Sequence, residues 1–281
     1  MYKILKKIEL TPSTKLMCIF APEVARKARA GQFVILRMHD HGERFPLTIT
    51  DYNKTEGTIT IVFAEVGKST RELGMLSEGD CIMNFIGPLG QPSEIEMYGT
   101  VVCIGGGIGV APVYPIARSL KQGGNRVISI IGARSRQLLF FEHEMALASD
   151  ELQIVTDDGS YGRQGFVTSA LQGLLDNGLK IDLVVAIGPV PMMRAVAEMT
   201  RPLGIKTTVS LNPIMVDGTG MCGGCRVSVG GVNKFACVDG PEFDAHSIDY
   251  DNLQLRQKMY LADEEVALAH WHECKCGGDV R

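Results

Sequence analysis

Three cysteines near the carboxyl end of the chain have the spacing of metal ligands. Cys222 and Cys225 are separated by two glycines and Cys237 follows after eleven residues, so three of the eight cysteines fall within sixteen positions. A C-x2-C pair can bind one metal centre from a tight loop, and a third cysteine on a following strand can close the site. The spacing therefore predicts zinc or an iron–sulfur cluster.

A four-ligand site needs one more donor, and Asp217 stands five positions before Cys222. That is the place of the first cysteine in the plant-type C-x4-C-x2-C loop. We interpret Asp217 as the fourth ligand beside the three cysteines. Two alternatives stay open: Cys274 or Cys276 from the tail completes the site, or Asp217 only caps the glycine turn.

Two glycine-containing loops follow apolar, strand-like runs farther up the chain. The run 101–104 leads into 105–112, Gly-Gly-Gly-Ile-Gly-Val-Ala-Pro, and then into a helical pattern. Such a loop lets a phosphate approach the backbone at a helix N-terminus. Gly188-Pro189 follows the fourth run and would reach the same edge of a sheet. Arg134 and Arg136 follow the second run, where they could bind a 2′-phosphate or line a solvated edge.

Two stretches in the amino-terminal third could hold a diphosphate. Residues 44–48, Arg-Phe-Pro-Leu-Thr, open one strand-like run, and residues 62–70 lead from another into a helix start. Ser69 and Thr70 could present hydroxyls and backbone N–H groups to an anion. Read alone, each stretch is equally an ordinary strand or helix cap.

The composition excludes several classes of protein. The 281 residues are 45% hydrophobic with a net charge of −4, and they show neither a basic patch nor an apolar run of membrane-spanning length. The charged, alternating N-terminus predicts a first strand and not a signal peptide. We expect a cytoplasmic protein whose clustered cysteines are ligands and not disulfides. The other cysteines in apolar runs, Cys18, Cys81 and Cys103, are expected in the core.

The pattern of apolar runs predicts a β barrel followed by an α/β parallel-sheet domain. Short runs at 16–20, 32–38, 46–50, 58–64 and 80–86 are bounded by turn residues, with helical stretches near 22–29 and 69–77. After residue 98, strand-like runs at 100–104, 126–131, 152–156 and 182–187 alternate with helical stretches near 112–121, 140–148, 165–175 and 190–201. We expect modules at 1–97, 98–210 and 211–250, then a helix and tail at 251–281.

The order of these motifs resembles a known family. A barrel with an Arg-containing Pro-Leu-Thr strand and a Gly-x-Ser-Thr helix start precedes Gly-Gly-Gly-Ile-Gly-Val-Ala-Pro, Gly-Pro-x-Pro-Met and the cysteine loop. This arrangement is similar to the ferredoxin–NADP reductase-like electron-transfer subunits that carry FAD and one [2Fe–2S] cluster. The resemblance spans roughly residues 2 to 260. An aspartate with three cysteines resembles the small subunits of the flavin-bifurcating NADH-dependent ferredoxin:NADP+ oxidoreductases, whereas those of dihydroorotate dehydrogenase B use four cysteines.

The resemblance also implies where the cofactors would lie. FAD is expected at Arg44, Phe45, Pro46, Leu47, Thr48, Val62, Phe63, Ala64, Glu65, Gly67, Lys68, Ser69 and Thr70. NAD(H) is expected at Gly106, Gly107, Gly109, Pro112, Gly188 and Pro189, with Arg134 close to its ribose. Two positions depart from the family's pattern: Phe45 stands where a flavin arginine is usual, and Ile187 stands where many plant-type reductases have a cysteine.

A flavin would be the converter between a hydride carrier and a one-electron cluster, and no protein acid or base is required for that transfer. The resemblance therefore implies an NAD(H)-dependent oxidoreductase subunit without a catalytic proton donor. It implies a larger partner with a second flavin, [4Fe–4S] clusters and the NADP(H) and ferredoxin sites. Alternatives are a subunit serving dihydroorotate dehydrogenase B or sulfide dehydrogenase, or, in another class, a zinc-stabilised nucleotide-binding regulatory protein.

Overall fold

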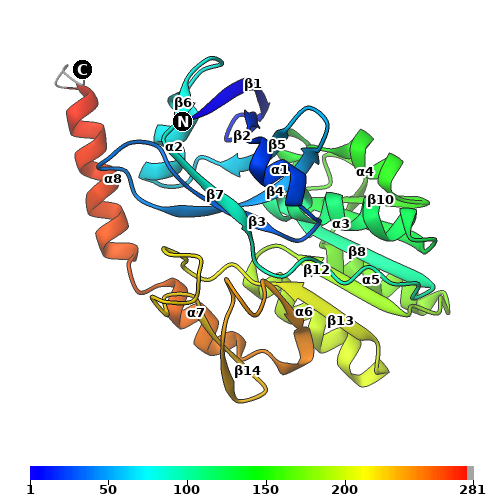
Figure 1. The fold of residues 1–281 in the computed structure, drawn as a ribbon. Coiled ribbons are helices and arrows are strands. Elements are labelled where there is room, and N and C mark those ends of the chain that lie inside the picture. Colours follow the sequence, from blue (N-terminus) through cyan, green and yellow to red (C-terminus); the bar gives the residue numbers. More distant parts are fainter. Residues whose placement is uncertain (277–281) are drawn as a thin grey trace.

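The computed structural model describes residues 1–276, with side chains described as far as Trp271. The amino-terminal part is a seven-stranded antiparallel sheet with the order β6-β1-β2-β5-β4-β3-β7. Only Met83 separates β6 from β7, so the two sheet edges meet and the predicted barrel is confirmed (Figure 1). Its elements are β1 (Tyr2–Thr11), β2 (Thr14–Phe20), α1 (Pro22–Lys27), β3 (Phe33–Arg37), β4 (Phe45–Asn53), β5 (Thr58–Ala64), α2 (Lys68–Met75), β6 (Cys81–Ile82) and β7 (Asn84–Leu89).

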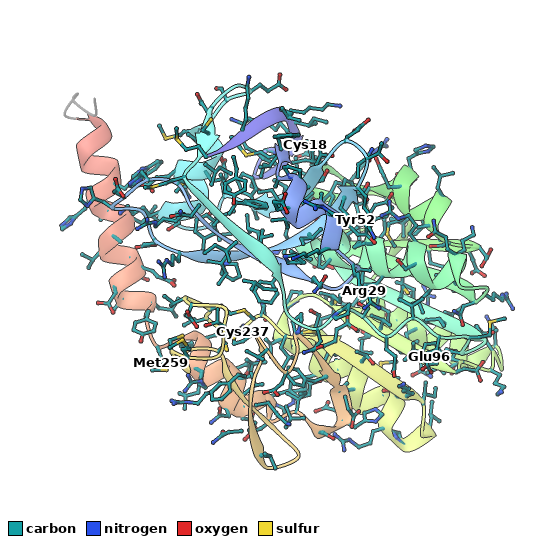
Figure 2. All side chains as sticks on the ribbon, viewed as in Figure 1. Cys18, Arg29, Tyr52, Glu96, Cys237 and Met259 are labelled. Atoms are coloured by element: carbon teal, nitrogen blue, oxygen red, sulfur yellow. The ribbon has the colours of Figure 1, made fainter. Side chains whose placement is uncertain are left out.

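Strand alternation explains where the barrel cysteines lie. In β2, Met17 and Ile19 are fully buried inside the barrel, while Cys18 between them points outward and is only half-buried (Figure 2). In β6, Ile82 is buried and Cys81 is exposed. The expectation that Cys18 and Cys81 belong to the core is therefore wrong. Cys18 lies on the outer face of β2, and Cys81 faces solvent from a strand of only two residues.

The second sheet is parallel, as predicted, except for one antiparallel edge strand. Its order is β11-β10-β9-β8-β12-β13-β16, and the helices between its strands cover both faces. Its elements are β8 (Thr100–Gly106), η1 (Gly107–Gly109), α3 (Val110–Gln122), β9 (Arg126–Ala133), η2 (Arg136–Leu138), α4 (Glu142–Ala148), β10 (Glu151–Thr156), β11 (Arg163–Gln164), α5 (Val167–Asp176), β12 (Leu183–Ile187), α6 (Val190–Thr200), η3 (Arg201–Leu203), β13 (Lys206–Ser210) and β16 (Glu242–Asp244).

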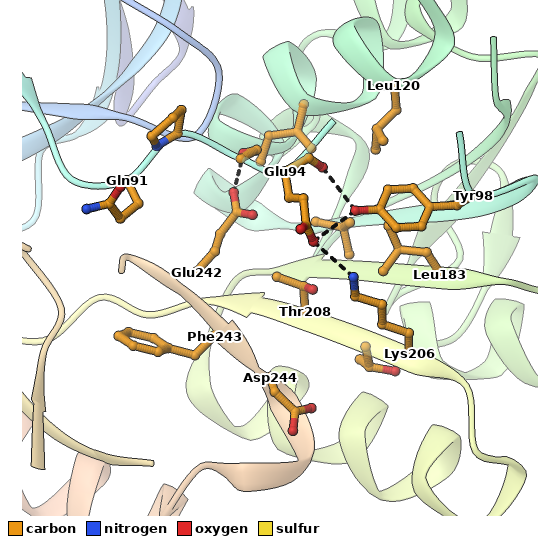
Figure 3. A pocket seen from close by; sticks show the side chains of 15 residues that line it. Gln91, Glu94, Tyr98, Leu120, Leu183, Lys206, Thr208, Glu242, Phe243 and Asp244 are labelled. Carbon is orange, nitrogen blue, oxygen red and sulfur yellow. Dashed lines mark hydrogen bonds and ion pairs between the residues drawn. The ribbon is translucent and has the colours of Figure 1, made fainter. Parts of the chain in front are cut away.

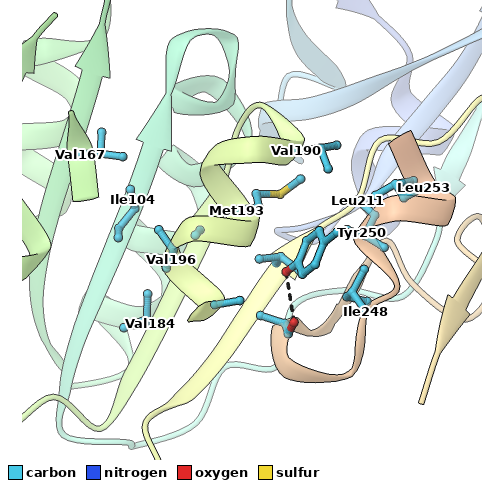
Figure 4. Close-up of a cluster of buried hydrophobic side chains, with 14 of the residues drawn as sticks. Ile104, Val167, Val184, Val190, Met193, Val196, Leu211, Ile248, Tyr250 and Leu253 are labelled. Atoms are coloured by element: carbon cyan, nitrogen blue, oxygen red, sulfur yellow. Dashed lines mark hydrogen bonds between the residues drawn. The ribbon is translucent and has the colours of Figure 1, made fainter. Parts of the chain in front are cut away.

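Two hydrophobic cores lie on opposite faces of this sheet. On β8, Val101 and Cys103 face α3 and α4, so the expected burial of Cys103 is confirmed, whereas Val102 and Ile104 face α5 and α6. The second core continues past α6 to Tyr250 and the segments that follow the cysteine loop (Figure 4). The sheet and the carboxyl-terminal module therefore share one core.

The carboxyl-terminal part consists of a hairpin, two helices and short connections. Its elements are β14 (Arg226–Val229), β15 (Val232–Phe235), η4 (Ala245–Ser247), α7 (Tyr250–Gln257) and α8 (Leu261–Cys276). α8 runs beside the barrel, where it contacts α2, on the side away from α3 and α4 (Figure 1). Within residues 1–276, no helix has both the length and the apolar character needed to cross a membrane.

Candidate cofactor and cluster sites

The cysteine loop joins β13 to the β14–β15 hairpin, and the hairpin brings two cysteines together. Arg226 pairs with Phe235 at the open end of the ladder, so the residues just outside it are neighbours. The sulfurs of Cys225 and Cys237 lie 3.2 Å apart, and both thiols are free and buried. Two sulfurs on one tetrahedral metal with bonds of about 2.3 Å would be roughly 3.8 Å apart. Small adjustments would therefore let one metal take both.

Cys222 occupies the exposed part of the same loop. Its sulfur accepts a hydrogen bond from the N–H of Gly224 at 3.5 Å, a contact typical of a loop that wraps sulfur ligands. Burial, with the neighbouring Cys225 thiol adding to it, raises the pKa of Cys237 to about 12. A bound cation would offset the free-energy cost of ionising this buried thiol, because metal ligation deprotonates thiols. Cys225 and Cys237 are thus close enough to share one metal, while Cys222 as a third ligand stays a prediction.

Asp217 caps the turn that precedes the cysteines. Its Oδ2 atom accepts hydrogen bonds from the N–H groups of Thr219 (3.0 Å) and Met221 (3.2 Å) and from the Thr219 hydroxyl. These bonds, led by those from Thr219 and aided by the charge of Arg44, lower the pKa of Asp217. Among the described residues, no three His, Cys, Asp or Glu side chains surround one point at ligand distances. Asp217 as a fourth ligand stays a prediction, and the side chains of Cys274 and Cys276 lie outside the described ones.

The cluster loop packs directly against the barrel. A Cβ on Gly218 would come within 2.7 Å of Ile35 and 2.8 Å of Leu89, which belong to β3 and β7. Gly218 also has a φ of +79°, which favours glycine. From the other side, the guanidinium of Arg256 on α7 donates to the Gly224 carbonyl at 3.1 Å. Sequence reasoning missed Arg256, because nothing in its own helix marks it as a neighbour of the loop.

The two predicted nucleotide loops meet at the carboxyl edge of the sheet. A Cβ on Gly188 would lie 3.1 Å from the Gly106 carbonyl oxygen, and one on Gly109 would lie 2.1 Å from the carbonyl oxygen of Ile187. Gly107, by contrast, has a φ of +56° and open space beside it. This cradle fits a pyrophosphate at the start of α3, where Pro112 lies in the first turn. Pro189 similarly stands at the N-terminal cap of α6.

The arginines expected near the ribose differ in their surroundings. Arg134 follows the carboxyl end of β9, as predicted, and its carbonyl oxygen accepts a hydrogen bond from the N–H of Asp158. The guanidinium of Arg136 stacks over the ring of Tyr161, with its carbon 4.8 Å from the ring centre. Both residues are therefore at the edge where a cofactor ribose is expected, and the choice between ribose and 2′-phosphate stays open.

The residues expected at FAD gather on β4, β5 and the start of α2, and several of their side chains are already engaged within the chain. Phe63 points into the barrel core and is 1% exposed, so its side chain cannot touch a surface ligand. Glu65 is ion-paired with Lys15 at 2.6 Å. The Thr70 hydroxyl accepts from the N–H groups of Val66 and Gly67, so it caps α2.

The remaining expected FAD residues leave a usable anion site. The first-turn N–H groups of α2, from Lys68 to Thr70, have no acceptor within the helix. The Ser69 hydroxyl donates to the Glu43 carboxylate, which a diphosphate would have to displace, and Arg44 is exposed just before β4. On the same helix, the buried Nε of Arg71 finds no hydrogen-bond partner among the described residues. An arginine on the first turn of α2 suits a diphosphate, and sequence reasoning missed it although Arg71 follows the Ser-Thr pair directly.

A separate pocket of about 330 Å³ lies where the segment after β7 crosses β13 and β16 (Figure 3). The Ser93 hydroxyl donates to Glu242, while Lys206 pairs with Glu94 at 2.9 Å. Burial raises the pKa of Glu242 to about 7, although the Ser93 hydrogen bond opposes that rise. Its lining comes from the segment after β7 and from α3, β12, β13 and β16, so the pocket lies at a junction between modules. None of its lining residues is one expected at a cofactor.

Comparison with known proteins supports an iron–sulfur region and an NAD-binding region in this chain. Residues 212–249 match the model of the iron–sulfur cluster binding domain of dihydroorotate dehydrogenase B, and residues 103–198 match the oxidoreductase NAD-binding domain. The chain is 47% identical to a Thermotoga maritima homologue of the dihydroorotate dehydrogenase B (NAD(+)) electron transfer subunit, covering 94% of this chain and 93% of that one. It is 35% identical to the Geobacillus thermodenitrificans electron transfer subunit, over 80% of this chain and 88% of the relative.

A solved structure gives the same result. The chain superposes on a protein of the NADH-dependent reduced ferredoxin-NADP oxidoreductase structure, described for flavin-based electron bifurcation, with a TM-score of 0.92 and 43% identity. The match covers 96% of this chain and 98% of that one. Barrel, parallel sheet and cysteine module thus form a ferredoxin–NADP reductase-like fold, and the chain belongs to the family of dihydroorotate dehydrogenase B-type electron-transfer subunits.

Proposed function

We propose that this chain is an NAD(H)-dependent electron-transfer subunit that holds FAD and a [2Fe–2S] cluster. It would exchange electrons with a larger partner, as in the NADH-dependent reduced ferredoxin-NADP oxidoreductase. One observation carries the proposal: the cluster loop and the proposed NAD(H) site both border the barrel, which would hold FAD. Gly218 of the cluster loop lies against Ile35 and Leu89, and Val62 of β5 packs in one core with Val110 of α3. Adjacent sites are what transfer between a hydride donor and a one-electron acceptor requires.

Each module would hold one group. The barrel, 1–97, would bind FAD with the first turn of α2, Arg71 and the outer residues of β4. The sheet module, 98–210, would bind NAD(H) at the meeting glycine loops, and the 211–250 module would bind the cluster. FAD bound there would supply the conversion between hydride and single-electron transfer. The chain's own part is to hold the carriers close, to orient them and to keep the thiols of Cys225 and Cys237 out of water.

We propose that the cluster is held by Asp217 together with Cys222, Cys225 and Cys237. The carboxylate has one oxygen, Oδ1, that takes no part in the bonds to Thr219 and Met221. A carboxylate donates less charge to iron than a thiolate and should shift the cluster's potential. Replacing Asp217 by Cys should retain the cluster and move its midpoint, whereas an unchanged midpoint would remove Asp217 from the ligand set.

The partner is proposed to dock beside the cluster loop. Met221, between Gly220 and Cys222 of that loop, is 87% exposed, and Val216 and Val238 flank the loop with 48% and 40% exposure. Apolar side chains gathered around a redox loop mark a protein interface. The occupant we propose is the larger subunit with its second flavin, [4Fe–4S] clusters and NADP(H) and ferredoxin sites. Substituting Met221 with Asp should weaken assembly of the complex while leaving cluster content intact, and unchanged assembly would refute this docking surface.

Dihydroorotate dehydrogenase B gives a second candidate function, favoured by the names of two relatives. In that case the partner would oxidise dihydroorotate. Co-purification with the neighbouring gene product, followed by assays with dihydroorotate and with ferredoxin plus NADP+, would separate the two. Reduction of NAD+ by dihydroorotate would refute the bifurcating role.

The proposal is tested by cofactor analysis of anaerobically purified chain. We expect one FAD, two irons and two acid-labile sulfides, with flavin and cluster absorption bands. A colourless protein that contains one zinc and no flavin would instead support a nucleotide-binding regulatory protein.

A further inference from the structure

An ion pair connects the proposed flavin strand to the proposed nucleotide helix. The guanidinium of Arg118 on α3 donates from Nη2 to Oδ1 of Asp51 on β4 at 2.6 Å. α3 begins at the glycine loop that would hold NAD(H), and β4 begins at the residues that would hold FAD. A shift of α3 against β4 would therefore move one cofactor site relative to the other.

Both partners are held in place by additional contacts. Asp51 Oδ1 also accepts the N–H of Tyr52 at 2.8 Å. Arg118 donates from Nη1 to the Tyr114 hydroxyl at 3.2 Å, and its guanidinium carbon lies 5.0 Å from the centre of the Tyr114 ring. These contacts restrict the Asp51 carboxylate and the long Arg118 side chain, so the pair has one defined geometry.

A distortion of β4 is needed to present Asp51 to α3. In a regular strand, Ile49 and Asp51 would point to the same face, and Ile49 is fully buried inside the barrel. The pairing of β4 with β5 shifts register between these residues, and this bulge turns Asp51 outward. The buried hydroxyl of Thr50 finds no hydrogen-bond partner in the described part of the chain, so the bulge is retained at a cost.

The other contacts described between α3 and the barrel strands are apolar and cannot fix their relative position so well. The polar contacts of Glu94 with Lys206 and of Ser93 with Glu242 join the segment after β7 to β13 and β16 and do not involve α3. Val62 and Ala30 of the barrel pack against Val110, Val113 and their neighbours on α3. Apolar burial is non-directional and tolerates small slides, whereas a charge-assisted hydrogen bond does not. Because Arg118 is 29% and Asp51 38% exposed, the pair adds little to stability. Its distinctive contribution is geometric.

We infer that Arg118 and Asp51 are positioning residues that set the approach of the nicotinamide to the flavin. The inference rests on the proposed function. Hydride transfer needs reacting atoms about 3–3.5 Å apart, and a misplacement of about 1 Å can lower its rate on the order of 100-fold. Loss of the pair should therefore slow transfer without weakening either cofactor's binding.

The test uses the full chain with FAD and cluster, in the variants Arg118→Met, Asp51→Asn and the double variant. We expect FAD content to be unchanged, NAD+ affinity to stay within about twofold and flavin reduction by NADH to slow at least about tenfold. The absorbance band from stacking of NAD+ on reduced flavin should also weaken. The double variant should be no slower than either single variant, because the two residues act as one unit. Arg194→Met is the matched control, since Arg194 pairs with Asp251 within the carboxyl-terminal half, and it should reduce flavin at the wild-type rate.

Unchanged reduction rates in the variants would overturn the inference, as would a loss of rate that only follows a loss of FAD. Additive effects in the double variant would also contradict it. A wild-type chain that holds FAD but is not reduced by NADH would refute the proposed function itself, which separates the two failures.

Discussion

Replacing Glu242 by Gln should make the protein more stable at pH 8 but not at pH 5. The carboxyl of Glu242 lies where the segment after β7 crosses β16, and it accepts the Ser93 hydroxyl. Barrel residue Gly31 closes over this pair, since a Cβ there would lie 2.8 Å from the Glu242 carboxyl and 2.1 Å from the Ser93 hydroxyl. Burial, with a smaller effect from the charge of Glu94, raises the pKa of Glu242 from 4.5 to about 7.

The sign follows from which state holds the proton. Between pH 4.5 and 7 the folded chain retains a proton on Glu242 that the unfolded chain has released. Stability from this group is therefore present below pH 4.5 and lost as the pH rises through 7. The rise from 4.5 to about 7 corresponds to a loss of about 3 kcal/mol. A neutral Gln can accept the same hydrogen bond from Ser93 and avoids this loss.

Thermal unfolding of wild type and Glu242→Gln, in the same cofactor state from pH 5 to pH 8, measures the effect. At pH 8 the variant should melt roughly 6 °C higher, because a chain of this size gains about 2 °C per kcal/mol. At pH 5 the two melting temperatures should agree to within about 2 °C. Glu23→Gln is the control, since Glu23 lies on α1, is 79% exposed and pairs with Arg26 of the same helix, and its melting temperature should match that of the wild type at both pH values. A melting difference that is the same at both pH values would refute the reasoning.

Three further predictions concern the sites. Gly109→Ala should abolish NADH binding or cost about 1–3 kcal/mol of stability, because its Cβ would lie 2.1 Å from the Ile187 carbonyl oxygen. Gly67→Ala is the comparison, since open space surrounds its Cβ. Equal effects of the two substitutions on NADH affinity and melting temperature would contradict the packing argument. Arg71→Met should weaken FAD binding at least about tenfold, as expected for a charge-assisted contact worth about 1.5–3 kcal/mol, whereas unchanged FAD affinity in equilibrium dialysis would exclude Arg71 from the site. Cys237→Ser should lower the iron content while leaving FAD in place, and retention of all iron would remove Cys237 from the ligands.

Much of the fold could be predicted from the sequence because its signals are local. The strand at 58–64 and the alternation of strands and helices after residue 98 are confirmed, since apolar periodicity and turn residues act within a few positions. β13 and β16 were missed because Lys-Thr-Thr-Val-Ser and Glu-Phe-Asp carry little apolar signal. Their place at the sheet edge is set by tertiary pairing.

The site could be predicted only in part. The cysteine loop and glycine loops carry their chemistry in their spacing, and the structure brings Cys225 to Cys237 and Gly106 to Gly188 as that spacing predicts. Pairs that join distant elements have no such signature. Arg118 and Asp51 are 67 positions apart, and only packing of α3 on the barrel makes them neighbours.

Anaerobic mixing of the purified chain with NADH, followed in the flavin and cluster absorption bands, tests the central claim most directly. We predict that flavin absorbance bleaches first, that cluster reduction follows in the same molecule, and that NADPH acts much more slowly. Bleaching of neither band by NADH, in protein shown to contain both groups, would contradict the account.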